Sequence, residues 1–169
     1  GLEPSIAVLV ATVRALKMNG GVSKENLADK NPEAVAKGCE NLGRHIENLK
    51  SFGIPVVVAI NHFLTDTDEE VIKIQEYAKE QGAEAIVCKH WEKGSQGITD
   101  LAKRVVGIVD GEKSQFAPLY PDDMTLIQKI ETVCKRIYRA DEAVLQETRT
   151  KRIIRKQGTA FRLSNFKEF

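Results

Sequence analysis

The sequence has no long hydrophobic run, and this absence excludes a membrane-spanning protein. A helix that crosses a bilayer needs about 20 consecutive apolar residues. The longest apolar runs here, Ile6–Ala11 and Val56–Ile60, have the length of strands. The formal net charge is only +1 at pH 7, so the whole chain is not strongly attracted to nucleic acid or to membranes. We therefore expect a soluble globular protein with a core of its own.

Cysteine and histidine are scarce, and their spacing matches neither a disulfide framework nor a metal-binding motif. An odd number of widely spaced cysteines favours a reducing, cytoplasmic location, where each thiol packs as a small buried apolar group. The three histidines are equally dispersed, so we expect no metal site built from this chain. These residues are Cys39, Cys88, Cys134, His45, His62 and His90.

Strand-like and helix-like segments alternate along the first two thirds of the chain. Three apolar segments predict buried strands, at Ser5–Ala11, Ile54–Ile60 and Ala85–Cys88. Helices are expected after Asn31-Pro32, after Thr67, and over Gly97–Val109. Such alternation predicts an α/β fold, with a mostly parallel sheet and flanking helices. The first strand is continuously apolar and should be fully buried.

The chain divides by composition into residues 1–113, 114–144 and 145–169. The first part is the α/β portion, and the second is a connector followed by a helix over Met124–Arg139. The last part carries seven Lys or Arg residues and two acidic ones. A basic tail can bind nucleic acid or membranes. A solvated chain end is the commoner explanation, so we expect no nucleic-acid partner.

Polar residues follow the second predicted strand, where open α/β sheets bind ligands. The amide of Asn61 offers both donors and an acceptor, which suits the edge of a purine or a pterin. Thr65 and Asp66 lie close enough in sequence to complete such a site. Alternatively, all three side chains only organise the turn and cap the next helix.

Two aromatic residues belong to loops that parallel strands should bring side by side. Phe63 follows the second strand, and Trp91 follows the third. Two facing rings would clamp a flat heterocycle, and stacking contributes on the order of 1 kcal/mol beyond buried area. The alternative is that each ring packs on its own edge of the sheet.

Cationic residues occur near the same strand ends. Lys93 and Gly94 precede a predicted helix, whose free amides favour an anion. Arg14 and Lys17 follow the first strand and could meet a phosphate or a carboxylate. Both pairs could equally be solvated. The phosphate-binding patterns GxxxxGK[ST] and GxGxxG do not occur in the sequence. The sequence thus contains residues that could line a ligand site, but it contains no phosphate-binding loop.

Several of these segments together resemble formate–tetrahydrofolate ligase, also called 10-formyltetrahydrofolate synthetase. The likeness runs from Gly1 to about Val144. It rests on four motifs in the family's order, namely Ala7–Gly21, Gly43–Asn48, Ile54–Asp68 and Cys88–Gly97, and continues through Gln115–Pro121 and Ile137–Asp141. Two places depart from the family pattern: Asn19 stands where the family usually has His, and Leu145–Phe169 does not resemble it.

The resemblance implies a fold related to P-loop nucleotide-binding proteins and a cytoplasmic homotetramer. It implies that ATP, formate and tetrahydrofolate give 10-formyltetrahydrofolate, ADP and phosphate through formyl phosphate. Magnesium would accompany the nucleotide, and a monovalent cation would activate the enzyme. The family lines its folate and nucleotide pocket with aromatic residues at the positions of Phe63 and Trp91.

The family's phosphate loop would lie before Gly1. We therefore expect a part of a ligase that does not turn over alone, because nothing in it can cradle the β and γ phosphates or hold magnesium. The alternative is a non-catalytic fragment or a ligand-binding or interaction scaffold.

Overall fold

A computed structural model describes residues 3–111, 113–145 and 161–163. Contacts within the chain separate two compact units, Gly1–Phe116 and Ala117–Phe169, and each is described by itself. The finer division at residues 113 and 144 that the composition suggests stays a prediction.

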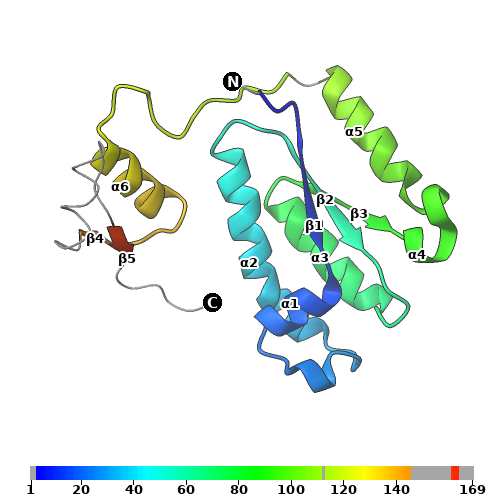
Figure 1. Ribbon diagram of the computed structural model, residues 1–169. Helices are drawn as coiled ribbons and strands as arrows, with labels where there is room; N and C mark the ends of the chain where they lie inside the picture. The colour runs from blue at the N-terminus through cyan, green and yellow to red at the C-terminus, as the bar shows by residue number, and fades with distance from the viewer. Residues whose placement is uncertain (1–2, 112, 146–160, 164–169) are drawn as a thin grey trace. The chain divides into compact units, whose positions relative to one another are not determined.

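The first unit is built on a three-stranded parallel sheet. Its strands are β1 (Ala7–Ala11), β2 (Val56–Asn61) and β3 (Glu84–Cys88), in the order β1-β2-β3 (Figure 1). The register pairs Ala7 with Val56 at one end of the sheet and Asn61 with Cys88 at the other. The prediction of an α/β fold with a parallel sheet and flanking helices is confirmed.

Helices follow each strand, and most begin where the sequence signals predict. They are α1 (Val13–Asn19), α2 (Pro32–Lys50), α3 (Asp68–Glu80), α4 (His90–Lys93) and α5 (Thr99–Gly111), with 3₁₀ turns η1 (Lys24–Asn26) and η2 (Gly94–Ile98). The Asn31 side chain accepts a hydrogen bond from Ala34 N at 2.9 Å, which caps α2. The capping box at Thr67 opens α3 as predicted. Helix α1 was not predicted, because seven residues are too few to show a clear helical period.

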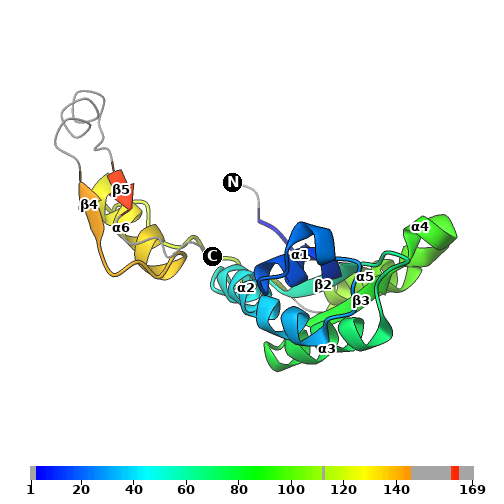
Figure 2. The ribbon, with the colours of Figure 1, turned by 90° about the horizontal axis from the view of Figure 1, so that it is seen from below.

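The hydrophobic core lies between one face of the sheet and helices α2 and α3 (Figures 1 and 2). An apolar stripe of α2 faces this core, through Val35, Cys39, Leu42 and Ile46. Helix α1 packs on α2 so closely that a Cβ at Gly38 would lie 1.9 Å from the carbonyl oxygen of Leu16. The close approach fixes α1 directly beside α2.

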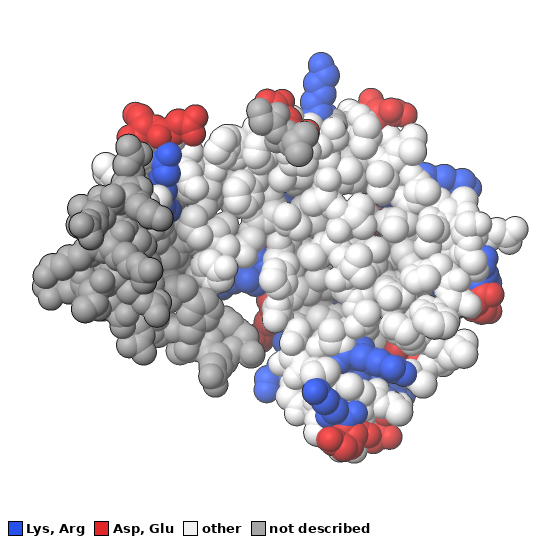
Figure 3. All heavy atoms as spheres, in the orientation of Figure 1, with Lys and Arg blue, Asp and Glu red and all other residues white. Residues whose placement is uncertain are grey.

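The first strand is not fully buried, contrary to the prediction. Val8 is 43% exposed and Val10 is 63% exposed, whereas Ala11 is buried. Val8 and Val10 point to the side of the sheet that is opposite the core, toward α5. Ile98 at the end of η2 and Leu101 in α5 approach this side but leave β1 partly open. Over the first unit, the face drawn in Figure 3 has few charged side chains at its centre, and most of them lie at its borders.

The second unit contains α6 (Leu126–Arg136) and an antiparallel pair of short strands, β4 (Ala143–Leu145) and β5 (Phe161–Leu163). The helix is shorter at both ends than the predicted Met124–Arg139. Thr125 caps its start through a capping box with Gln128, and Ile137 is the residue at its C-terminal cap. Cys134 is the buried residue of this helix. Most of the basic tail lies outside the described residues. No helix within the described ranges is long and apolar enough to cross a membrane.

A buried ion pair joins α1 to the start of α3. Lys17 Nζ lies 2.6 Å from Glu70 Oε1, and the two side chains are 1% and 0% exposed. Burial by itself raises the pKa of the Glu70 carboxyl, but hydrogen bonds from Asn31 N, Lys17 and Thr67 outweigh it and lower the pKa below its ordinary value. Lys17 was predicted to meet a ligand, and the structure instead places its ammonium in a buried ion pair enclosed by protein.

Native-state thiol labelling tests the packing of the cysteines. All three are buried, and burial raises the pKa of the Cys39 thiol to about 12. Since the thiolate is the reactive form, a thiol reagent at about pH 8 should modify none of them rapidly in the folded chain and all of them in denaturant. Rapid modification of native Cys39 would contradict the described core.

The Glu70 carboxyl should make stability sensitive to acid. Its pKa is lowered in the folded state, so the unfolded chain binds more protons and the stabilisation is lost as the pH falls through the folded-state pKa. Urea unfolding of the wild type should lose more free energy on acidification than unfolding of the neutral double variant Lys17→Met/Glu70→Gln. Equal losses would show that this carboxyl does not contribute.

Candidate ligand site at the carboxyl end of the sheet

The ends of β2 and β3 lie directly beside each other. Asn61 pairs with Cys88 in the register, and His62 N donates a hydrogen bond to the Cys88 carbonyl at 3.1 Å. The loops that follow these two strands therefore start from adjacent points. This is the arrangement that the alternation of strands and helices predicts.

The two aromatic rings meet, as predicted from their positions after these strands. The ring centroids of Phe63 and Trp91 are 6.3 Å apart, and the ring planes are inclined by 41°. A heterocycle held between parallel rings needs about 7 Å, because each stacking contact takes about 3.5 Å. The rings thus form a closed, tilted pair, and the predicted open gap is not present in this conformation.

Arg14 joins the aromatic pair from α1. Its guanidinium lies over the Phe63 ring, 5.1 Å from the centroid, and Arg14 Nη2 donates to Thr65 Oγ1 at 3.3 Å. The sequence placed Arg14 at the same edge of the sheet but gave no sign of this contact. Together, these contacts hold a cation beside an aromatic face.

Asp66 serves the loop itself. Its Oδ2 accepts from Phe63 N at 2.9 Å, and Asp66 N donates to the Phe63 carbonyl at 2.9 Å. The alternative interpretation of Asp66, as a residue that organises the turn, therefore describes its observed contacts. Its effect on the site is to fix the backbone that carries Phe63.

Lys93 and Gly94 lie beyond Trp91 and are exposed. Lys93 ends the short helix α4, and Gly94 adopts a positive φ of 56° at its C-terminus. The long helix α5 begins only at Thr99, after η2, so Lys93 and Gly94 do not immediately precede its free amides. The predicted anion site at a helix start gains no geometric support here.

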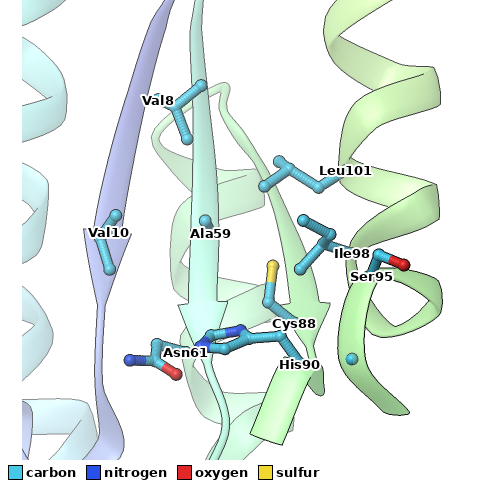
Figure 4. Close-up of a pocket in the computed structure, with 10 residues that line it drawn as sticks. Val8, Val10, Ala59, Asn61, Cys88, His90, Ser95, Ile98 and Leu101 are labelled. Atoms are coloured by element: carbon cyan, nitrogen blue, oxygen red, sulfur yellow. The ribbon is translucent and has the colours of Figure 1, made fainter.

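A hollow of about 440 Å³ opens between the sheet and α5 (Figure 4). Its walls are mostly apolar, and polar groups stand at the strand ends, where Asn61 and His90 lie (Figure 4). Asn61 Oδ1 is buried and has no hydrogen-bond partner among the described residues, so it can accept from a bound molecule. The lining residues are Val8, Val10, Ala59, Asn61, Cys88, His90, Gly94, Ser95, Ile98 and Leu101.

His90 and Ser95 line the hollow but were not among the predicted site residues. Both lie in the segment after β3 that also carries Trp91. The sequence therefore indicates that they are near the strand ends, but it does not show which way their side chains point. Burial raises the pKa of the Cys88 thiol on the same wall, which keeps it neutral. Among the described residues no group of three or more His, Cys, Asp or Glu could hold a metal ion.

Comparison with known proteins decides the family. The family model described as formate–tetrahydrofolate ligase matches residues 1–163. This chain belongs to the formate–tetrahydrofolate ligase family. The ligase of Roseobacter denitrificans is 60% identical over 147 residues, which cover 87% of this chain and 26% of that protein. The ligase of Ruegeria pomeroyi is 61% identical over 144 residues, covering 85% and 26%.

The chain spans about a quarter of the length of these formate–tetrahydrofolate ligases. The family match also extends beyond Val144, to residue 163. The two pairwise matches, by contrast, cover only 147 and 144 residues of the chain. The departure of Leu145–Phe169 from the family pattern therefore stays a prediction.

A double-mutant cycle measures the contact between Arg14 and Phe63 in this ligase-family chain. Arg14→Ala and Phe63→Leu should be coupled by about 0.5–1 kcal/mol in the free energy of unfolding, the range of an exposed cation–π contact. Lys37→Ala, an exposed cation on α2, paired with Phe63→Leu is the control and should show additivity. Additivity in the Arg14 cycle as well would mean that the contact is not formed in solution.

Proposed function

We propose that this chain is part of an enzyme that ligates formate to tetrahydrofolate. The reaction consumes ATP and yields 10-formyltetrahydrofolate, ADP and phosphate, with formyl phosphate as the intermediate. Two facts support the proposal: the family to which the chain belongs, and the meeting of Phe63 and Trp91 at the strand ends. The second is the observation that carries the ligand-binding role, because two rings from neighbouring loops can recognise a flat ring system.

A flat ligand would enter by separating the rings. Trp91 is 73% exposed and belongs to the four-residue helix α4, whereas Phe63 is half-buried in a hydrogen-bonded turn. Trp91 is thus the ring that can move at lower cost. The pterin of tetrahydrofolate and the adenine of ATP are both flat heterocycles that such a pair would stack on.

Polar groups around the rings would orient the ligand. Asn61 offers a buried acceptor, and the Arg14 guanidinium offers a cation that suits a carboxylate or a phosphate. Thr65 contributes a hydroxyl beside Arg14. Lys93 and Gly94 lie in the next loop and would contact the ligand's outer part.

The described residues hold no group of three or more His, Cys, Asp or Glu that could bind a metal ion, and the sequence has neither a GxxxxGK[ST] nor a GxGxxG pattern. We therefore propose that this chain binds ligand but does not complete the reaction alone. Magnesium, a monovalent activating cation, a homotetrameric assembly and a cytoplasmic location are proposed for the whole enzyme from its family.

Ligand titration followed by tryptophan emission tests the binding role. Trp91 is the only tryptophan of the chain, so its emission reports this site alone. Tetrahydrofolate or an ATP analogue should change the emission. Phe63→Ala should weaken binding by about five- to tenfold, since one stacking contact is worth roughly 1–1.4 kcal/mol.

Leu64→Ala is the matched control, because Leu64 lies in the same loop and is 88% exposed. Its affinity should stay within about twofold of the wild type. If millimolar ligand leaves both emission and chemical shifts of the wild type unchanged, the chain is a scaffold without a preformed site. Formation of 10-formyltetrahydrofolate by the isolated chain would instead overturn the proposal that it cannot turn over.

A further inference from the structure

The ammonium of Lys17 is fully used inside the protein. Besides Glu70, it donates to the carbonyl oxygens of Leu27 at 3.2 Å and Asp29 at 2.8 Å. An ammonium has three N–H groups, and these contacts employ all of them. A buried lysine is rare unless it is paired in this way. The side chain therefore ties α1 to the segment that leads into α2.

The two oxygens of Glu70 do different work. Oε2 accepts from the backbone N and the Oγ1 of Thr67, at 3.0 and 2.9 Å, and closes the first turn of α3. Oε1 accepts from Asn31 N at 2.8 Å and from Lys17. One oxygen is thus a local cap, and the other is a link between three segments that are distant in sequence.

The capped residue Thr67 directly follows the loop that carries Phe63. Asp66 precedes Thr67, and its carboxylate accepts from Phe63 N at 2.9 Å. Polar contacts therefore run from Lys17 through Glu70 to Thr67, the peptide bond joins Thr67 to Asp66, and a hydrogen bond links Asp66 to the backbone of Phe63. A shift of the α3 start would be passed to the aromatic ring along this path.

Helix α1 also holds the other side of the loop. Arg14 lies one helical turn before Lys17 and contacts both Phe63 and Thr65. The same short helix therefore fixes the loop at its base, through Lys17, and near its tip, through Arg14. Because α1 is packed tightly on α2 at Gly38, it is a firm support for both contacts.

We propose that Lys17 and Glu70 are positioning residues that hold loop 62–67, so that Phe63 stays in place beside Arg14 and Trp91. The expected effect of this positioning on ligand affinity rests on the proposed ligand-binding function. The positioning of the loop itself can be measured without ligand. The competing explanation is that the pair stabilises the whole fold and has no particular effect on the loop.

The double variant Lys17→Met/Glu70→Gln separates these explanations. Glutamine can still serve in a capping box, so the local cap of α3 is kept while the charged link to α1 and Asn31 is lost. The matched control is Lys30→Met/Glu69→Gln. Lys30 and Glu69 form an exposed ion pair between the same two regions of the chain, with side chains 56% and 58% exposed.

Amide hydrogen exchange of the ligand-free chain is the first measurement. In Lys17→Met/Glu70→Gln, the amides of Phe63 and Asp66 should exchange at least about tenfold faster than in the wild type, while those of Val58 and Ile60 in β2 change by less than about threefold. The exposed-pair control should match the wild type. Equal acceleration of loop and strand amides, or no change in the loop, would overturn the inference.

Affinity for tetrahydrofolate is the second measurement. In the folded chain, Lys17→Met/Glu70→Gln should weaken tetrahydrofolate binding by about tenfold. This decrease in affinity should largely vanish in a Phe63→Ala background, because the ring that the ion pair positions is then absent. Fully additive losses would contradict positioning. If the wild type binds neither tetrahydrofolate nor an ATP analogue, the proposed function fails, and hydrogen exchange alone decides the inference about the loop.

The single variant Glu70→Gln provides a second route if the double variant does not fold. It keeps the cap and the two carbonyl contacts of Lys17 while removing the opposite charge. The same contrast between loop and strand amides is then expected, with a smaller difference, and its absence would overturn the inference.

Discussion

The parallel pairing of β2 with β3 is the constraint on which the site depends. Backbone hydrogen bonds set Asn61 opposite Cys88, and a slip by one residue would turn every side chain of the strand to the other face of the sheet. The register therefore decides where both loops begin. It brings Phe63 and Trp91 together although neither strand contributes to the ring contact itself. The sheet sets where the two loops begin, and the loops carry the side chains that could contact a ligand.

Helix α1 is the second element that the site needs. It buries Val13 and Leu16 in the core, directs Lys17 into the interior, and leaves Arg14 exposed at the aromatic pair. One short helix of seven residues thus contributes to the core, to the buried ion pair and to the aromatic site. A helix of this length has little stability of its own in water, so its geometry comes from tertiary packing against α2. The site is consequently coupled to the core through contacts that no local motif contains.

The sequence supported accurate prediction where local physics dominates. Asn31 and Pro32 start a helix because of capping chemistry and a fixed φ, and the structure has this start. The meeting of Phe63 and Trp91 followed from strand order alone. The burial of Lys17 was not predicted, because its partner Glu70 is far away in the sequence and a lysine after a strand is usually solvated. The exposure of Val8 and Val10 was missed for a similar reason, since the coverage of a strand depends on which elements pack on it.

The closed aromatic pair has an energetic consequence for ligand binding. Phe63 and Trp91 contact each other, and an aromatic pair is worth about 0.5–1.5 kcal/mol beyond buried area. A ligand that stacks between them must first break this contact, so the apparent affinity is reduced by the fraction of molecules in which the rings are apart. The contact also shields apolar surface of both rings when no ligand is bound. Phe63 is also held by its contact with Arg14, whereas Trp91 is exposed and lies on a short helix. Separation of the rings therefore requires mainly a movement of Trp91, which costs less free energy than a movement of Phe63.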